Sequence, residues 1–221
     1  MAPPQPKNYN PGDIRGIDVS HYQGTINWQK VAASNVVFGI AKATDGLGLK
    51  DTHFTDNYEG MRSNGILRGA YHFFRPKLDA KAQADSFLHV VKQLKPGDLP
   101  PALDVESDGG KPASVIIKGI RTWIDEVEKA LGRTPMIYTG GFFWNSKVAG
   151  TDEFAENPLW VAHYTSKPKP NMPKGFPAYA IWQFTSKGGA AVSGINTGPG
   201  KDLDLDRFNG TMDDLRKLAG L

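Results

Sequence analysis

Short apolar runs, rich in β-branched and aromatic residues, alternate along the chain with longer stretches of helical periodicity. This alternation is typical of repeated β/α units around a parallel sheet. The pattern predicts strands in eight segments: RGIDVS, VVFGIAKAT, LRGAYHFF, PPALDVE, PMIYTGG, PLWVAHY, YAIWQF and LDLDRF. Apolar residues at helical spacing predict helices between the early strands and after the last one, at residues 27–34, 54–63, 80–94, 113–131 and 212–218.

The pattern changes after the fifth predicted strand, PMIYTGG. The segments TSKPKPNMPKGFP and TSKGGAAVSGINTGPGK contain too much Pro, Gly and Lys for ordinary helices, so we expect loops between the last strands. The sequence shows no internal repeat and no linker followed by a second module. The predicted fold class is therefore α/β, with one barrel domain at residues 14–221.

The first residues, MAPPQPKNYNPGD, are polar and Pro-rich and have no apolar core of a signal sequence. We expect a flexible lead-in at residues 1–13, and no signal peptide is visible in the chain. No apolar run reaches the roughly 18 residues that a membrane helix needs, so we expect no membrane insertion.

Composition and charge narrow the possible partners. The 221 residues are 39% hydrophobic and 22% charged, which is ordinary for a globular protein. The formal net charge of +3 comes from 26 basic and 23 acidic residues without a dense basic block, and we expect no nucleic-acid partner. The absence of cysteine excludes disulfides, thiol catalysis and cysteine-ligated metals.

Two acidic residues interrupt an otherwise apolar strand segment. Asp104 and Glu106 are two positions apart in ALDVE, so on a strand their side chains share a face, with Cα atoms roughly 6.5 to 7 Å apart. In such barrels the carboxyl ends of the strands and the following loops build the active site. Asp18, late in RGIDVS, and Asp204 or Asp206, in LDLDRF, occupy comparable places. We therefore expect an inward-facing acidic cluster.

Carboxylates this close repel each other. At an effective dielectric constant near 20, charges about 6.5 Å apart repel by roughly 2.5 kcal/mol, which corresponds to about two pKa units. A proton on one acid, a bound cation, or hydrogen bonds and basic partners would each offset the repulsion. A protonated acid beside an ionised one is what glycosidic cleavage requires, whereas a cation would indicate phosphoryl or enolate chemistry.

Other candidate chemistry is sparse. Aromatic residues cluster in or just after the predicted strands, where flat rings can stack on sugar faces, although such residues are more often part of a core. His21, His72 and His163 lie near strand ends, but no HExxH motif or similar ligand spacing is present. We expect no catalytic metal and no cofactor. The sequence also has no nucleophile elbow, P-loop or dinucleotide-binding fingerprint.

Six motifs, in order, resemble those of one family. They are GIDVSHYQGTINW, ALDVE, IYTG, LWVAHY, AIWQF and DLDRFNG, and the segments FGIAKATDG and GAYHFFRP agree with them. From about Gly16 to the end, the chain resembles glycoside hydrolase family 25, the Chalaropsis-type lysozymes. The resemblance implies a modified TIM-like barrel, (β/α)5(β)3, with its late strands joined by loops. It also implies cleavage of the β-1,4 bond between N-acetylmuramic acid and N-acetylglucosamine in bacterial peptidoglycan.

The same resemblance implies roles for individual residues. Glu106 is expected to be the general acid that protonates the leaving oxygen, with Asp104 as its partner carboxylate. Asp104 either orients the N-acetyl oxygen of the substrate as nucleophile, which gives retention, or assists water directly. Asp18 and Asp204 match the other site acids of the family and are expected to tune the pKa values of the pair. The remaining substrate-binding residues are expected to be Tyr71, Phe73, Tyr138, Trp160, Tyr164 and Gln183.

One motif departs from the family pattern. Many relatives read Val-Asp-Leu-Asn where this chain reads Leu-Asp-Leu-Asp, so an additional acid, Asp206, lies two positions after Asp204. If Asp206 also faces inward, we expect it to raise the pKa of Glu106 further or to attract a cation.

Three functions remain open from the sequence. The favoured one is a muramidase that is secreted, or otherwise delivered to the cell wall, and acts there as a monomer on peptidoglycan. A metal-dependent barrel enzyme would use the same acids differently and would lose activity with a chelator. A non-catalytic wall-binding module would keep the aromatic groove without turnover, but a pure binder gains nothing from the mutual repulsion of Asp104 and Glu106.

Overall fold

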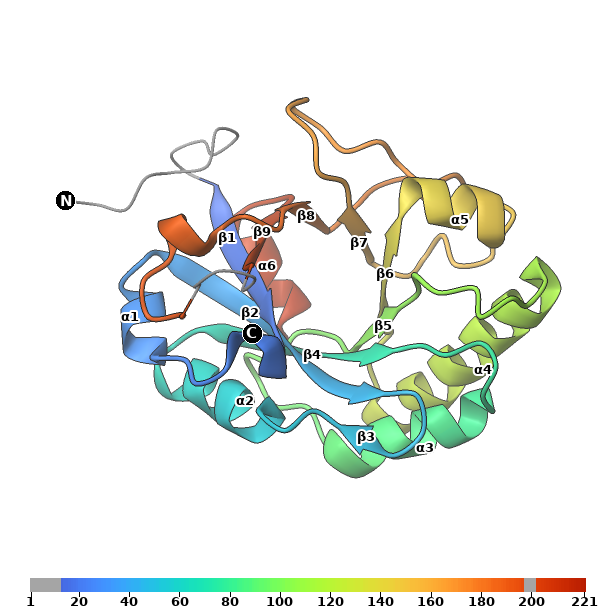
Figure 1. The fold of residues 1–221 in the computed structure, drawn as a ribbon, viewed down its shortest axis with the longest axis horizontal. Coiled ribbons are helices and arrows are strands. Elements are labelled where there is room, and N and C mark those ends of the chain that lie inside the picture. The colour runs from blue at the N-terminus through green and yellow to red at the C-terminus, as the bar shows by residue number, and fades with distance from the viewer. Residues whose placement is uncertain (1–12, 197–201) are drawn as a thin grey trace.

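The computed structural model describes residues 13–196 and 202–221 (Figure 1). Apart from its last residue, the predicted lead-in at 1–13 lies outside the described residues. The same holds for residues 197–201, which belong to one of the predicted late loops.

The described residues form one sheet of nine strands. In chain order these are β1 (Ile14–Val19), β2 (Val36–Asp45), β3 (Leu49–Lys50), β4 (Leu67–Phe73), β5 (Ala102–Asp104), β6 (Met136–Gly140), β7 (Leu159–Ala162), β8 (Ile181–Thr185) and β9 (Asp204–Phe208). All except β3 close into a barrel in the order β1-β9-β8-β7-β6-β5-β4-β2, because β1 also pairs with β2. The eight predicted strands are therefore the strands of the barrel, and the short β3 is an addition that forms a hairpin with the end of β2.

The barrel is mixed rather than wholly parallel. Strand β9 is antiparallel to both of its neighbours, β1 and β8. The other pairs in the ring are parallel. Because of this reversal, β9 begins at the rim of the barrel where β1 and β8 end.

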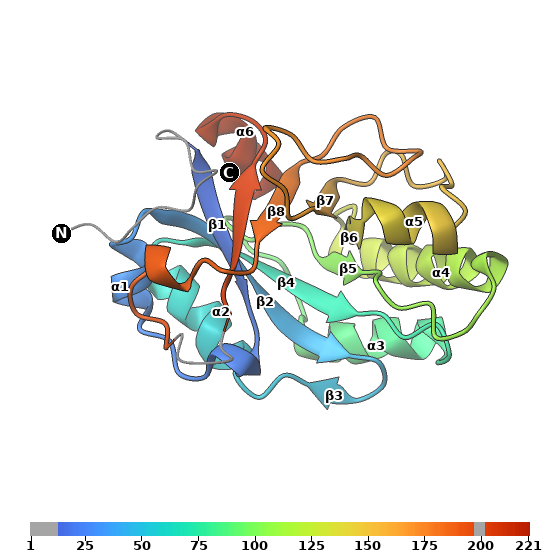
Figure 2. The ribbon, with the colours of Figure 1, turned by 45° about the horizontal axis from the view of Figure 1, so that its top comes forward.

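Helices follow the first five barrel strands and lie on the outside of the barrel, as Figures 1 and 2 show. They are α1 (Trp28–Ala32), α2 (Phe54–Ser63), α3 (Ala80–Val90), α4 (Ala113–Leu131) and α5 (Gly141–Lys147), and α6 (Met212–Leu218) comes after the last strand. No α-helix of the described residues lies between β6 with its helix α5 and the end of β9. The implied (β/α)5(β)3 architecture, with late strands joined by loops, is thus confirmed.

The helices differ from the predicted ones in three places. Helix α1 is shorter at both ends than 27–34, and α3 ends at Val90 rather than 94. At the latter end Val91 leaves helical geometry, with ψ at 84°, and packs into the core. Helix α5 was not predicted from periodicity, because a helix this short offers only two turns and begins at paired glycines.

Two hydrophobic cores follow from the alternation of side chains along the strands. Outward-facing residues such as Ile17 and Val161 pack beneath the helices in the larger core. Inward-facing residues such as Phe38, Met136 and Ile181 fill the barrel in a second core. The barrel is therefore a packed interior with a polar mouth at one end.

Helix α4 shows how the sequence specifies the outer layer. Ile116, Ile120 and Trp123 recur at helical spacing and are fully buried. Val115, which shares the apolar run, is 43% exposed because it lies off this face. Gly132 ends the helix in the left-handed region, at φ 67°, where glycine is favoured.

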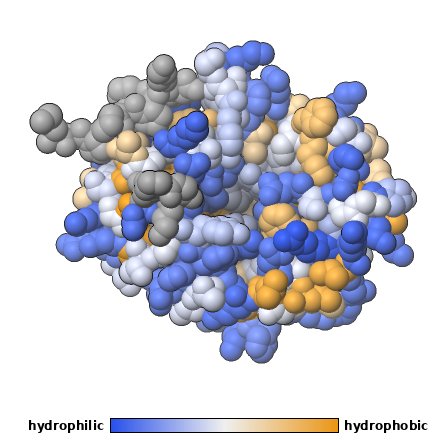
Figure 3. Space-filling view, viewed as in Figure 1, coloured by the Kyte–Doolittle hydropathy of each residue, from blue (hydrophilic) through white to orange (hydrophobic). Residues whose placement is uncertain are grey.

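The outer surface is largely hydrophilic on the face shown in Figure 3, with an apolar patch over the β2–β3 hairpin. Exposed leucines of that region are Leu47, Leu49 and Leu78. Among the described residues, no helix combines the length and hydropathy that crossing a bilayer requires.

Candidate active site

A pocket of about 290 Å³ opens at the mouth of the barrel. It is lined by every residue of the predicted site: Asp18, Tyr71, Phe73, Asp104, Glu106, Tyr138, Trp160, Tyr164, Gln183 and Asp204. The structure thus brings together side chains from β1, β4, β5, β6, β7, β8 and β9. Their roles in binding or chemistry are taken up below as proposals.

Sequence reasoning did not assign five further lining residues to the site: Val19, Ser20, Tyr22, Gln23 and Lys42. Lys42 left a signal in the sequence, because it interrupts the apolar strand β2 at the same inward alternation as Phe38 and Ile40. Ser20 and Gln23 cap the short 3-10 helix after β1 and accept hydrogen bonds reciprocally. That capping box holds the loop at the edge of the pocket.

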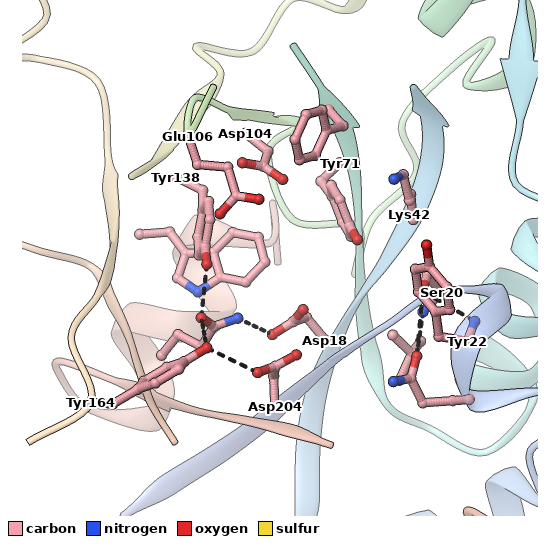
Figure 4. Close-up of a pocket in the computed structure, with 15 residues that line it drawn as sticks. Asp18, Ser20, Tyr22, Lys42, Tyr71, Asp104, Glu106, Tyr138, Tyr164 and Asp204 are labelled. Atoms are coloured by element: carbon pink, nitrogen blue, oxygen red, sulfur yellow. Dashed lines mark hydrogen bonds between the residues drawn. The ribbon is translucent and has the colours of Figure 1, made fainter. Parts of the chain in front are cut away.

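Asp104 and Glu106 lie on one side of the pocket, across from Asp18 and Asp204 (Figure 4). The hydrogen-bonded strand β5 ends at Asp104, so Glu106 lies two residues beyond the strand. The sequence pattern predicted both acids on the strand. The backbone is nevertheless held on both sides, because Phe74 N–H donates to the Asp104 carbonyl at 2.9 Å and Val105 N–H donates to the Tyr138 carbonyl at 2.9 Å. Alternation therefore continues, and both acids face the pocket.

The two acids differ in environment. Asp104 is 5% exposed, whereas Glu106 is among the exposed residues. Burial raises the pKa of Asp104 well above its ordinary value, and the nearby charge of Glu106 raises it further. Burial also raises the pKa of Glu106, against the opposing charge of Lys42. One carboxyl oxygen of Asp104, Oδ1, is buried and has no hydrogen-bond partner among the described residues.

A cationic group balances part of this negative charge. Lys42 Nζ donates to Asp45 Oδ2 at 2.9 Å, and Arg75 donates through Nε to Asp45 Oδ1 at 2.7 Å. The ring of Phe73 contacts both cations, with its centroid 5.0 Å from Lys42 Nζ and 4.2 Å from the Arg75 guanidinium carbon. Both cations lower the pKa of Glu106. The ring of Phe73 therefore helps to place charge beside the acid pair.

A hydrogen-bond network joins the acids on the opposite side (Figure 4). Gln183 Nε2 donates to Asp18 Oδ2 at 2.7 Å, and Gln183 Oε1 accepts from the hydroxyls of Tyr138 at 2.8 Å and Tyr164 at 2.9 Å. The Tyr164 hydroxyl also lies 3.1 Å from Asp204 Oδ1. The amide of Gln183 thus fixes two phenols and one carboxyl in a single arrangement.

Both aspartates of β9 face inward, which settles the register that the sequence left open. Asp204 pairs with Asp18 across the β1–β9 ladder, and Asp206 pairs with Gly16 one step deeper. Burial raises the pKa of Asp204 to about 6. The negative charge of Asp204 contributes to the raised pKa of Glu106. Asp206 lies one layer below the pocket, and its predicted effect on the pKa of Glu106 stays a prediction.

The histidines are held in other ways than as a metal site. His21 Nδ1 lies 2.7 Å from Asp51 Oδ2, and His163 Nδ1 accepts from the backbone N–H of Asn171 at 3.0 Å. His72 is fully buried, and burial lowers its pKa to about 4. Within residues 13–196 and 202–221, no group of three or more acidic or histidine side chains is arranged to hold a metal ion.

Comparison with known proteins places these features in context. Residues 17–193 match the family described as Glycosyl hydrolases family 25. YegX of Escherichia coli K12, an uncharacterized protein, is 41% identical over 93% of this chain and 73% of its own length. Lysozyme M1 of Streptomyces globisporus is 35% identical over 99% of this chain and 76% of its own. The crystal structure of the bacterial lysozyme from Streptomyces coelicolor superimposes with a TM-score of 0.88 and 34% identity, over 95% of this chain and 98% of that one.

Proposed function

The chain belongs to family 25 of the glycosyl hydrolases, and from this membership we propose that it cleaves the β-1,4 bond between N-acetylmuramic acid and N-acetylglucosamine in peptidoglycan. The family resemblance predicted from the sequence motifs is thereby confirmed, and the protein is a glycoside hydrolase. Its similarity to lysozyme M1 over nearly the whole chain supports the peptidoglycan substrate. We further propose that residues 14–221 form the catalytic unit and that it acts at the cell wall, after secretion or another form of delivery, as a monomer.

The acid pair at the mouth of the barrel is the observation that carries this proposal. Glu106 is the general acid, since its pKa is raised and its side chain reaches the open part of the pocket. A raised pKa extends to higher pH the range over which a carboxyl keeps the proton that it delivers to the glycosidic oxygen. The adjacent acid, Asp104, is the partner carboxylate.

Asp104 acts in a substrate-assisted reaction that retains configuration. Asp104 lines the pocket, so its carboxylate can accept a hydrogen bond from the N–H of an N-acetyl group. That bond would stabilise the ionised form of Asp104 and leave the shared proton on Glu106. The ionised Asp104 would then orient the acetamido oxygen, which attacks the anomeric carbon as the glycosidic C–O bond breaks and the leaving oxygen takes the proton of Glu106. Water later opens the resulting ring and returns a proton to Glu106.

Asp18 and Asp204 bind sugar hydroxyls and set the local potential. Asp204 raises the pKa of Glu106, and the network through Gln183 holds Asp18 in place. Among the aromatic lining residues, Tyr22 is 69% exposed and Tyr164 is 54% exposed, so their rings are available to stack on sugar faces.

Trp160 and Tyr138 play a different part in the pocket. Trp160 is 2% exposed and packs against Tyr138, with 4.6 Å between ring centroids. Together with Tyr71, whose ring centroid lies 6.2 Å from that of Trp160, they form the floor on which a sugar would rest.

The test is digestion of purified peptidoglycan in the presence and absence of a chelator. New reducing ends on N-acetylmuramic acid, formed equally in both samples, would support a metal-independent muramidase. Loss of cleavage with chelator would favour the metal-dependent alternative instead. Binding to cell walls without any cleavage would favour the wall-binding module.

A further inference from the structure

Asp206 is a fully buried acid that does not line the pocket. It lies on the inner face of β9, one step deeper than Asp204, where the next inward residue is the core residue Phe208. A charge at this depth borders the apolar interior of the barrel, and its desolvation is costly unless it is paired or neutralised. Any role of Asp206 is therefore exerted through the residues that it touches.

The two oxygens of Asp206 have different surroundings. Oδ1 accepts a hydrogen bond from Trp160 Nε1–H at 2.7 Å. Oδ2 is buried and finds no donor among the described residues. The carboxyl of Asp18 is its diagonal neighbour across the β1–β9 ladder, because Asp18 pairs with Asp204 and Gly16 pairs with Asp206. A hydrogen bond between the two carboxyls contributes to the pKa of each of them. Two carboxyl groups can form a hydrogen bond only when one of them holds a proton.

We propose that Asp206 is a positioning residue that shares one proton with Asp18 beneath the floor of the pocket and thereby fixes the direction of the Asp18 carboxyl. Asp18 then has a donor on each side, the Gln183 amide at 2.7 Å and the proton of the pair. Asp206 itself is fixed by Trp160, which also forms part of the floor. The arrangement neutralises one of the acids in a crowded cluster without a cation.

The groups that face Asp206 favour one proton shared between Asp206 and Asp18 over two ionised carboxylates. Asp204 on its own strand is the acid whose charge raises the pKa of Asp206, whereas a hydrogen bond to Asp18 on β1 lowers it. Strands β7 and β8 supply the neutral side chains Trp160 and Gln183. Burial is the largest influence and raises the pKa of Asp206 to about 7 and that of Asp18 well above its ordinary value. The pair consequently keeps its proton in acid and loses it as the pH rises past neutral.

Substituting Asp206 by asparagine separates this role from a purely structural one. An asparagine can still accept from Trp160, and its N–H₂ donates to Asp18 at every pH, so it imitates the protonated carboxyl permanently. Leucine has the same branching, with methyl groups in place of the two oxygens, and removes both contacts. Asp213→Asn is the matched control, since Asp213 is an exposed acid in the first turn of α6.

The first measurement is a carbon-13 NMR titration of the aspartate carboxyls, which needs no substrate. The signal followed is the assigned Asp18 carboxyl, whose pKa is raised in the wild type and is expected to stay raised in Asp213→Asn. In Asp206→Asn the pKa of Asp18 is expected to fall, because the amide donates to its ionised form and the neighbouring charge is gone. An Asp18 pKa in Asp206→Asn that equals or exceeds the wild-type value would overturn the proposal. The outcome of this titration does not depend on the proposed muramidase activity.

The second measurement, which rests on the proposed function, is the pH profile of peptidoglycan hydrolysis. In Asp206→Asn, activity on the basic side of the optimum is expected to be a larger fraction of the activity at the optimum than in the wild type. Asp206→Leu is expected to lose activity at all pH values, and Asp206→Asn to recover part of it. An Asp206→Asn profile identical in shape to that of the wild type would contradict the shared proton.

Discussion

Replacing Asp104 by asparagine tests the electrostatic coupling of the acid pair. The change removes the negative charge that Asp104 carries when ionised, two residues from Glu106, and keeps the size of the side chain. A negative neighbour raises the pKa of a carboxyl, so its removal lowers the pKa of Glu106. The proton needed for leaving-group departure is then lost at lower pH, and the basic limb of the pH profile moves downward.

The expected size of this shift follows from the geometry. Carboxylates separated by about 6.5 Å repel by roughly 2.5 kcal/mol at an effective dielectric constant of 20, or about two pKa units. Solvent screens the exposed Glu106, so we expect about half of this, a shift of about one unit. Lys42 remains in place in the variant and continues to lower the pKa of Glu106.

The assay combines the pH dependence of kcat/KM on soluble peptidoglycan fragments with carbon-13 titration of the Glu106 carboxyl. The titration reports the pKa even if the variant turns over too slowly to give a profile. Asp213→Asn serves as the control, because it removes a distant exposed charge. A Glu106 pKa in Asp104→Asn that equals or exceeds the wild-type value would refute the coupling.

Three further predictions follow from other contacts. Lys42→Met removes a cation that lowers the pKa of Glu106, so the basic limb of the activity profile should move to higher pH. Gly60→Ala should destabilise the protein by about 1 to 3 kcal/mol in urea unfolding, despite the higher helix propensity of alanine, because the new Cβ would lie 2.1 Å from the Trp28 ring. Burial lowers the pKa of His72 to about 4, so the folded state is stabilised above pH 6.5 relative to acid and loses this stability as the pH falls toward 4. In His72→Gln the loss of stability between pH 6.5 and 4 should be smaller by up to about 3 kcal/mol. The pH dependence of thermal unfolding measures this loss.

Hydrophobic periodicity predicted the helices that bury only one of their faces. Helices α2, α4 and α6 begin and end at the predicted residues, since each has a clear pattern or cap in its own sequence. Strand direction was not predictable in this way, because an antiparallel strand shows the same alternation as a parallel one. The alternation therefore predicts β9 as a strand but not its antiparallel direction. For the same reason it does not predict that Asp204 begins the strand rather than ending it.

The candidate site was predictable where a charge interrupts an apolar run. Asp104 and Glu106 carry that signal in the sequence, and the structure places both at the pocket. Lys42 carries it equally and was passed over. The proton sharing that we propose between Asp206 and Asp18 was not predictable from the sequence, because it depends on the register between β1 and β9 and on the Trp160 indole that occupies one oxygen of Asp206.

The central claim is that Glu106 supplies the proton for cleavage of the glycan strand. The most direct test is mass spectrometry of the products of purified peptidoglycan digested with wild-type protein and with Glu106→Gln, after both have been shown to fold and to bind the substrate. The account predicts muropeptides with reducing N-acetylmuramic acid from the wild type and a loss of several orders of magnitude in the variant. Near-normal cleavage by Glu106→Gln would contradict it.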